Sequence, residues 1–213
     1  MKDVLKTKDG FCYLKGEKFV ISQVSNDYKA VAFSPNDIVV DVGANVGAFS
    51  HLAESKGVKK VIAVEPNTDA FGVLSQNTDS ARTKAINAAV VAPNGPKTLT
   101  LYKSETSVIS SCIPVRGREQ VETKTIGIDK LMACSPTVLK VDIEGYEYEW
   151  ITTIAFPESL KQIAVELHLL KDDMVQKHDD ALANMEKQGF RILSTNDMKS
   201  YGKLCAKSYV LAR

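Results

Sequence analysis

Residues 39–50, VVDVGANVGAFS, combine an apolar strand, a glycine turn and the start of a helix. The run 37–42 (DIVVDV) is rich in β-branched side chains, which predicts a short buried strand. Glycine at positions 43 and 47 lets a backbone approach a ligand closely, because no Cβ intervenes. The helix that follows offers free N–H groups in its first turn. The stretch therefore predicts a ligand site, although the two glycines also suit tight packing of helix against strand.

The rest of the chain repeats this alternation of strand and helix. Further strands are predicted at residues 60–65, 84–91, 137–142 and 162–168, and helices over about 67–77, 146–154 and 174–188. Residues 190–194 and 204–211 have the pattern of a closing antiparallel pair. Buried strands that alternate with amphipathic helices predict an α/β fold with a mostly parallel sheet and helices on both of its faces.

Residues 1–35 do not follow this pattern. The runs 11–14 and 19–23 resemble two strands of a hairpin, joined by a turn around Gly16. We therefore expect residues 1–35 to form an N-terminal extension packed on the core, and residues 36–213 to form one domain.

Residues 93–130 also differ from the strand–helix alternation. The alternation at 98–102 is typical of an edge strand, and the polar run 104–117 predicts a loop. Residues 1–35 and 103–125 carry no recognisable motif. If the protein is an enzyme, these two segments are expected to determine which substrate it accepts.

Two acids fall at successive strand ends. Asp41 lies at the end of the first core strand, and Glu65 ends the next one, 24 residues later. An acid at the second position can accept both hydroxyls of a ribose. The glycine turn lacks the G-x-G-x-x-G dinucleotide pattern, because Asn45 replaces the middle glycine. A site with acids in place of a phosphate cradle suits a nucleoside that carries positive charge, and S-adenosylmethionine fits this description.

Four further polar residues lie at the ends of the strands predicted at 137–142 and 162–168. They are Asp142, Glu144, Glu166 and His168. They are expected to line one rim of the cleft beside the methyl donor. If the nucleoside donates a methyl group to a hydroxyl, Asp142, Glu144 and His168 are the candidates for the base that takes the hydroxyl proton. His168 has the most suitable ordinary pKa, about 6.5, and Asp142 is expected nearest the sulfonium. Structural roles, such as helix caps or a satisfied histidine, remain alternatives for all three.

Four motif blocks resemble the FkbM family of S-adenosylmethionine-dependent methyltransferases. They are VVDVGANVGAFS at 39–50, AVEPNTDAFGVLSQN at 63–77, LKVDIEGYEYEWI at 139–151 and AVELH at 164–168. The resemblance covers roughly residues 36–170. It implies a Rossmann-like class I methyltransferase fold, with a seven-stranded sheet in the order 3-2-1-4-5-7-6 and the last strand antiparallel.

The resemblance also implies O-methylation of a hydroxyl on a sugar, glycan or other small metabolite, with S-adenosylmethionine as cofactor. Its motifs imply a set of cofactor-binding residues, with the methionine part near the glycine turn, the ribose at Glu65 and the adenine near residues 87 and 88. That set comprises Asp41, Gly43, Ala44, Asn45, Gly47, Glu65, Asn87, Ala88 and Asp142. A metal held by Asp142, Glu144 and His168 suits the ligand types, but no metal is expected.

The composition of the chain argues against several other classes of function. A formal net charge of +1 over 213 residues argues against a strong electrostatic footprint for nucleic acid or for an anionic membrane. No apolar run approaches the ~20 residues of a membrane helix, and the N-terminus lacks the apolar region of a signal peptide. The four scattered cysteines favour free thiols in a reducing compartment, so a cytoplasmic location is expected.

Two alternatives to a small-molecule methyltransferase stay open. One is an RNA methyltransferase on the same fold, which needs a basic face with stacking aromatic residues. The other is a module that holds the nucleoside without chemistry. The acids that follow residue 141 argue against this module.

Overall fold

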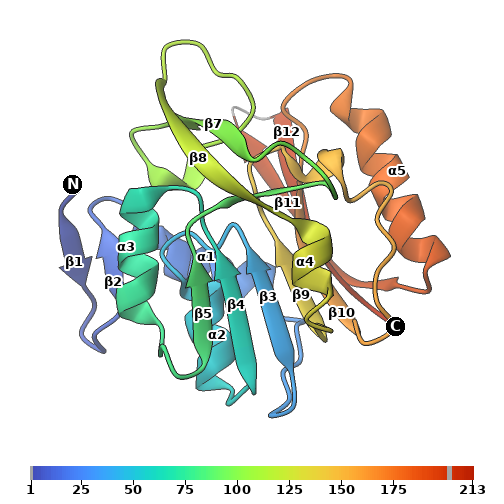
Figure 1. Cartoon of the computed structure of the whole chain (residues 1–213), viewed down its shortest axis with the longest axis horizontal. Coiled ribbons are helices and arrows are strands. Elements are labelled where there is room, and N and C mark those ends of the chain that lie inside the picture. Colours follow the sequence, from blue (N-terminus) through green and yellow to red (C-terminus); the bar gives the residue numbers. More distant parts are fainter. Residues whose placement is uncertain (1, 201–202) are drawn as a thin grey trace.

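The main sheet of the protein confirms the predicted architecture. The computed structural model describes residues 2–200 and 203–213 (Figure 1). Within these residues the main sheet has seven strands. In spatial order they are β5 (Thr83–Ile86), β4 (Lys60–Val64), β3 (Ile38–Val42), β9 (Val138–Val141), β10 (Gln162–His168), β12 (Lys203–Ala212) and β11 (Arg191–Ser200). β12 is antiparallel to both of its neighbours, and the other neighbouring pairs are parallel. Numbered along the chain, this is the order 3-2-1-4-5-7-6.

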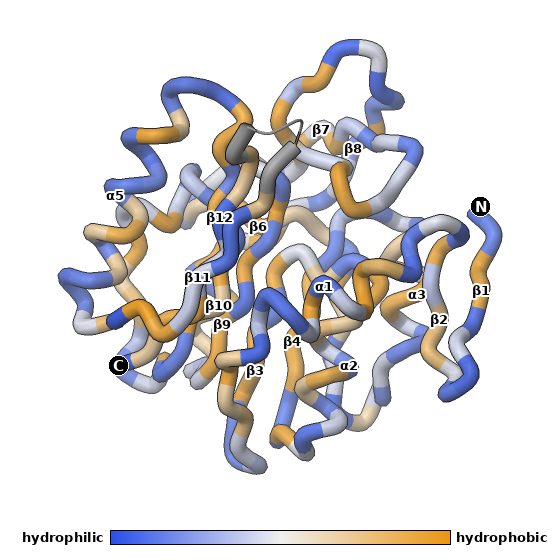
Figure 2. The backbone as a smooth tube through the Cα atoms, turned by 180° about the vertical axis from the view of Figure 1, so that it is seen from behind, coloured by the Kyte–Doolittle hydropathy of each residue, from blue (hydrophilic) through white to orange (hydrophobic). Residues whose placement is uncertain are grey.

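Helices cover both faces of this sheet. They are α1 (Phe19–Asp27), α2 (Ala48–Ser55), α3 (Thr68–Asn77), α4 (Ile128–Met132) and α5 (Met174–Lys187). Because side chains alternate along a strand, Val40 and Val42 lie in one apolar core with residues of α4 and α5, whereas Val39 lies in a second core with residues of α2 and α3. Figure 1 shows α4 in front of the sheet and α2 behind it. The tube in Figure 2 is mainly hydrophobic along β3 and β4 and mainly hydrophilic in the outer loops.

The N-terminal prediction is partly wrong. A hairpin is present, but it pairs β1 (Val4–Lys6) with β2 (Cys12–Leu14). Residues 19–23, predicted as its second strand, belong to α1. Val20 and Val24 are one helical turn apart, so a helix directs both towards the body of the protein. Val20 packs in a cluster with Val46 and Ala48, which ties α1 to the start of α2.

The predicted strand at 84–91 is in fact two strands in two sheets. β5 ends at Ile86, and β6 (Ala89–Val91) pairs with β8 (Glu119–Gly127) in a separate three-stranded sheet that β7 (Thr98–Lys103) completes. The chain leaves the main sheet at Asn87, whose side-chain amide donates to the carbonyls of Glu65 and Pro66. The small sheet lies above the carboxyl ends of the main strands (Figure 1). β8 and α4 were not anticipated from the sequence.

The helix predicted over 146–154 is also wrong. The structure has one short 3₁₀ helix, Glu147–Glu149, followed by turns. The carboxylate of Glu147 folds back and accepts the backbone N–H groups of Ile143 and Gly145. A side chain used in this way stabilises a tight turn rather than a regular helix start.

The loop predicted over residues 104–117 is confirmed. The 104–117 segment is largely irregular, with a 3₁₀ turn at Ser107–Ile109. None of the helices in the described residues is both long enough and apolar enough to cross a bilayer.

Candidate functional site

A cavity opens at the carboxyl ends of β3, β4 and β9, where ligands bind in open α/β sheets. Its empty volume is about 930 Å³, including space open to solvent, and typical ligand pockets measure roughly 300–1,000 Å³. The glycine turn and the segments after β4, β5 and β9 form one part of its wall. Side chains from α1, from the start of α2 and from the 107–112 segment form the rest.

The glycine turn is shaped by backbone conformations that few residues adopt. Gly43 has a φ of 75°, and a Cβ there would lie 1.8 Å from the backbone oxygen of Asp142. Asn45, where the dinucleotide pattern has glycine, also has a positive φ of 50°, a conformation that asparagine tolerates better than most residues. The N–H groups of Gly43 and Ala44 both donate to the carbonyl of Val64. The D-V-G-A-N-V-G motif thus holds a turn without bulky side chains against the end of β4.

Glu65 lies on the cavity wall at the end of β4. One carboxylate oxygen accepts the N–H of Asn45 and the other accepts the N–H of Asn67, both at 2.8 Å. Burial raises the pKa of Glu65 to about 7, although these two hydrogen bonds oppose the shift. The side chain is therefore held in one orientation, with lone pairs left for a ligand.

Asp41 does not line the cavity, and its side chain is fully buried. One of its oxygens accepts the Ser50 hydroxyl at 2.7 Å, and the other lies 3.4 Å from the Lys140 ammonium. This placement corrects the prediction that Asp41 contacts the donor. Strand alternation directs its side chain to the face that α2 covers, not to the strand end.

Lys140 is a cavity residue that the sequence analysis missed. Its Nζ donates to the carbonyl of Gly43 at 2.6 Å and lies 3.7 Å from a carboxylate oxygen of Asp142. Burial alone would lower the pKa of this lysine, but the surrounding carboxylates outweigh it and raise the pKa. The signal was present in the sequence, because Lys140 opens the K-x-D-x-E-G-x-E block.

The other predicted donor-site residues divide into two groups. Gly43, Ala44, Asn45, Glu65, Ala88 and Asp142 line the cavity, but Gly47 and Asn87 do not. Gly47 is the N-cap of α2 with a φ of 86°, and a Cβ there would meet Leu74 at 2.7 Å. Asn87 holds the Glu65 and Pro66 carbonyls instead of facing the cavity. For these two residues a supporting role replaces the predicted contact.

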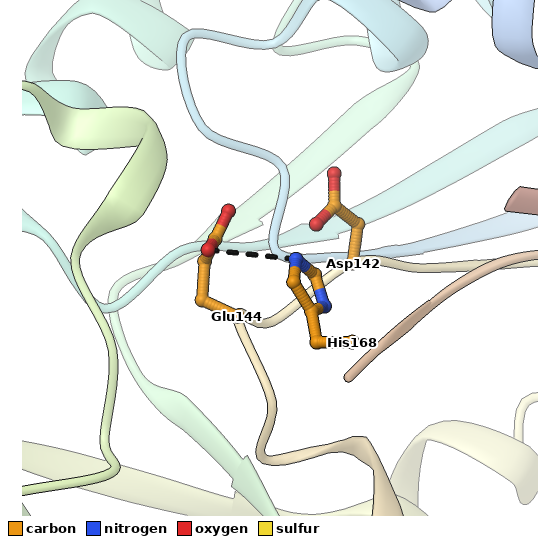
Figure 3. A group of neighbouring side chains, drawn as sticks. All are labelled: Asp142, Glu144 and His168. Atoms are coloured by element: carbon orange, nitrogen blue, oxygen red, sulfur yellow. Dashed lines mark ion pairs between the residues drawn. The ribbon is translucent and has the colours of Figure 1, made fainter. Parts of the chain in front are cut away.

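The predicted catalytic group is brought together as expected, but its members are not equivalent (Figure 3). Asp142 and Glu144 line the cavity, whereas His168 lies behind them and is 4% exposed. The His168 Nε2 is 3.4 Å from a Glu144 oxygen and 3.5 Å from a Glu166 oxygen. Its Nδ1 is 2.7 Å from Glu147.

The carboxylates around His168 change the pKa of its imidazole ring. Burial disfavours the imidazolium, but the charges of Glu147 and Glu144 outweigh burial and raise the pKa well above 6.5. The ordinary pKa of about 6.5, for which His168 was the most suitable of the candidate bases, therefore does not apply in the folded chain. Burial also raises the pKa of Glu144, and it raises that of Glu166 to about 8. The carboxylates around the imidazole therefore favour its protonated form.

The same three side chains have the donor atoms of a metal site. One ligand atom each of Asp142, Glu144 and His168 lie within 4.8 Å of one another. A ligating histidine offers a neutral nitrogen, so a metal would have to displace the proton that the carboxylates favour on His168.

A second network joins three distant segments beside the cavity. Glu17, which is buried, accepts the backbone N–H of Ser107 at 2.8 Å and also its hydroxyl. The Ser107 hydroxyl in turn accepts from the Asn45 amide at 3.0 Å. Sequence reasoning missed this link, because Glu17 and Ser107 lie outside the motifs and meet Asn45 only through the tertiary fold.

Comparison with known proteins indicates the family of this chain. Residues 41–192 match the model of the methyltransferase FkbM domain. The hexuronic acid methyltransferase AglP of Haloferax volcanii is 30% identical over 166 residues, which cover 73% of this chain and 64% of that protein. The chain therefore matches less than two thirds of the length of this relative.

Solved structures share the fold. The structure of P. horikoshii TYW2 in complex with MeSAdo has a TM-score of 0.59 at 16% identity, covering 98% of this chain and 70% of that one. M. jannaschii TYW2 in complex with AdoMet has a TM-score of 0.54 at 16% identity, covering 100% of this chain and 86% of that one. The match over residues 41–192 and the geometry of its motifs agree: this chain belongs to the FkbM methyltransferase family.

Proposed function

We propose that this protein uses S-adenosylmethionine to methylate a hydroxyl group on a sugar, a glycan or another small acceptor. Family membership supports methyl transfer. The hexuronic acid methyltransferase from Haloferax volcanii supports a sugar-containing acceptor, and acidic sugars are the first class to test.

The observation that carries the proposal is one cavity that joins Glu65 to Asp142 and Glu144. The residues on its wall fit the proposed cofactor. Glu65 offers two fixed carboxylate oxygens to a ribose. Gly43 leaves bare backbone where a Cβ would collide with the chain after β9. Acidic groups at this end of the sheet suit a ligand that carries an ammonium and a sulfonium.

When bound, the cofactor supplies a methyl group on a sulfonium, which is already a strong electrophile. The protein therefore has to align the acceptor oxygen with that methyl group. Asp142 is the carboxylate on the cavity wall at the end of β9, and we assign it to the cationic part of the donor. Lys140 and Asp41 hold the turn that carries Gly43, and so position the backbone beneath the ligand.

Glu144 is the best placed of the three candidate bases. It lines the cavity, and burial raises its pKa towards the range in which a base is effective at neutral pH. Its carboxylate would take the proton of the acceptor hydroxyl, so that the oxygen could accept the methyl group of a bound donor and leave S-adenosylhomocysteine as the second product. His168 lies behind Glu144 and orients its carboxylate through the 3.4 Å ion pair.

Two linked measurements test this function. Calorimetric titration with S-adenosylhomocysteine is expected to give micromolar binding, and the Glu65→Gln and Glu65→Ala variants are expected to bind more weakly. A transfer assay with a labelled methyl donor then compares glucuronic and galacturonic acid glycosides, the corresponding neutral hexosides, and RNA. Absence of binding by the unsubstituted protein would overturn the proposal. Binding without transfer to any acceptor would favour the nucleoside-binding module, and transfer to RNA alone would favour the RNA methyltransferase.

A further inference from the structure

Tyr28 is part of the cavity wall although it precedes the family-matched region 41–192. It is the C-cap residue of α1, and its side chain is 3% exposed. Its ring meets Phe49 of α2 edge to face, with the ring centroids 5.5 Å apart. The aromatic ring therefore packs against Phe49 without help from the hydroxyl group, so packing does not explain why the hydroxyl is present.

The hydroxyl of Tyr28 has no hydrogen-bond partner among the residues that the structure describes. Burying a hydroxyl without a partner is unfavourable, and such groups in native proteins call for an explanation. Because Tyr28 contributes to the wall of the cavity, an acceptor atom of a bound ligand is the simplest partner. Burial and the charge of Asp142 raise the pKa of Tyr28 well above its usual range, so the hydroxyl keeps its proton and acts as a donor.

The sheet order indicates which end of the cofactor lies near Tyr28. Glu65 ends β4, on one side of β3, and Asp142 follows β9, on the other side. Asp27, the residue before Tyr28, accepts a hydrogen bond from the Asn196 amide of β11 at 2.5 Å, so this end of α1 lies towards the side of the sheet that contains β9 and β10. A donor whose ribose is at Glu65 and which crosses β3 brings its amino-acid part to this side.

We propose that the Tyr28 hydroxyl donates a hydrogen bond to the α-carboxylate of the cofactor's amino-acid part. This inference rests on the proposed function and adds a residue outside the family motifs to the cofactor site. The neighbouring carboxylates suit the ammonium of the same amino-acid part, which leaves the α-carboxylate for a neutral donor and for Lys140. The N-terminal segment thereby completes the site instead of only packing on it.

The experiment compares two ligands that share the adenosine part and differ in the amino-acid part. S-Adenosylhomocysteine has the α-carboxylate, whereas 5′-methylthioadenosine lacks the whole amino-acid end. Both are titrated by calorimetry into the unsubstituted protein, Tyr28→Phe, Glu65→Gln and the control Tyr102→Phe. Tyr28→Phe is expected to lose roughly 10- to 100-fold in affinity for S-adenosylhomocysteine, the range for a hydrogen bond to a charged group, and to bind methylthioadenosine unchanged. Glu65→Gln is expected to weaken both ligands, and Tyr102→Phe neither.

Thermal unfolding of the ligand-free proteins separates binding from folding. Because the hydroxyl has no partner without ligand, Tyr28→Phe is expected to unfold at the same temperature as the unsubstituted protein, or higher. An equal loss of affinity for both ligands, or no loss for either, would overturn the assignment. Failure of the unsubstituted protein to bind either ligand would overturn the proposed function, and the role of Tyr28 with it.

Discussion

The Nδ1 of His168 lies 2.7 Å from Oε1 of Glu147, and the same oxygen accepts the backbone N–H groups of Ile143 and Gly145. One carboxylate therefore ties the turn that carries Glu144 to the end of β10. Glu147 is fully buried and does not line the cavity. It is a positioning residue that sets both the shape of the turn and the charge of His168.

Removing the charge of Glu147 is expected to lower the pKa of His168. Glu147→Gln keeps a hydrogen-bond acceptor but takes away the largest electrostatic contribution that favours the imidazolium. NMR titration of the histidine ring measures this pKa directly. His178→Gln serves as the assignment control. An unchanged pKa of His168 in Glu147→Gln would contradict the conclusion that Glu147 stabilises the imidazolium.

The same pair links stability to pH. The folded protein holds the His168 proton more tightly than the unfolded chain, in which the pKa is about 6.5. Its contribution to stability is therefore complete below pH 6.5 and is lost as the pH rises through the raised folded-state pKa. Urea unfolding is expected to show this loss above pH 6.5, and the loss is expected to shrink in Glu147→Gln.

Glu144→Gln is expected to lower kcat by about 10²–10⁴-fold, the usual contribution of a general base. Affinity for S-adenosylhomocysteine is expected to stay nearly unchanged. His168→Asn is expected to lower kcat less, because His168 positions Glu144 and does not line the cavity. Steady-state kinetics and calorimetry on both variants check this order. A larger loss of kcat in His168→Asn would return the role of base to the histidine.

Cofactor binding is expected to weaken below pH 7. Accepting two ribose hydroxyls requires an ionised Glu65, whose pKa burial raises to about 7. Affinity for S-adenosylhomocysteine should then fall by up to about tenfold for each pH unit below 7, because the protonated free protein has to release a proton on binding. Calorimetry in buffers of different ionisation enthalpy counts this proton. Glu65→Gln is expected to bind weakly with no such pH dependence.

Gly43→Ala is expected to destabilise the protein by roughly 3 kcal/mol or more, at the upper end for overpacking, and to abolish cofactor binding. The new Cβ would lie 1.8 Å from a backbone oxygen, which cannot move without displacing β9. Gly72→Ala is the matched control. Gly72 lies in α3, and a Cβ added there would meet nothing within 4 Å, so alanine should stabilise by about 0.5–1 kcal/mol. Chemical unfolding of both variants measures these changes in the free energy of unfolding.

Chelation with EDTA is expected to leave methyl transfer unchanged. His168 and Lys140 already supply positive charge to the carboxylates, and a protonated imidazole has no lone pair for a metal. The check is the transfer rate after exhaustive chelation, with and without added Mg²⁺ or Mn²⁺. A rate that is lost and then restored by one of these ions would assign Asp142, Glu144 and His168 to a metal site.

The sequence by itself determined the central strands of the main sheet and predicted a candidate site at their carboxyl ends. The β-branched runs were long enough to fix β3, β4, β9 and β10, because strand periodicity is a local property of the chain. The glycine turn and Glu65 were also readable, since a positive φ and an acid at a strand end each restrict the residue type. Elements shorter or less periodic than these, such as α1 and the Glu147–Glu149 turn, were assigned wrongly.

Only the tertiary structure decided which polar residues face the ligand. Asp41 and Asp142 look alike in sequence, yet one is buried beneath Lys140 and the other lines the cavity. The structure also brought Tyr28 and Ser107 to the site from segments without motifs. The direction and partners of a side chain depend on which strands and helices become neighbours, and the pKa values of Glu65 and His168 depend on burial and charges that exist only in the folded chain.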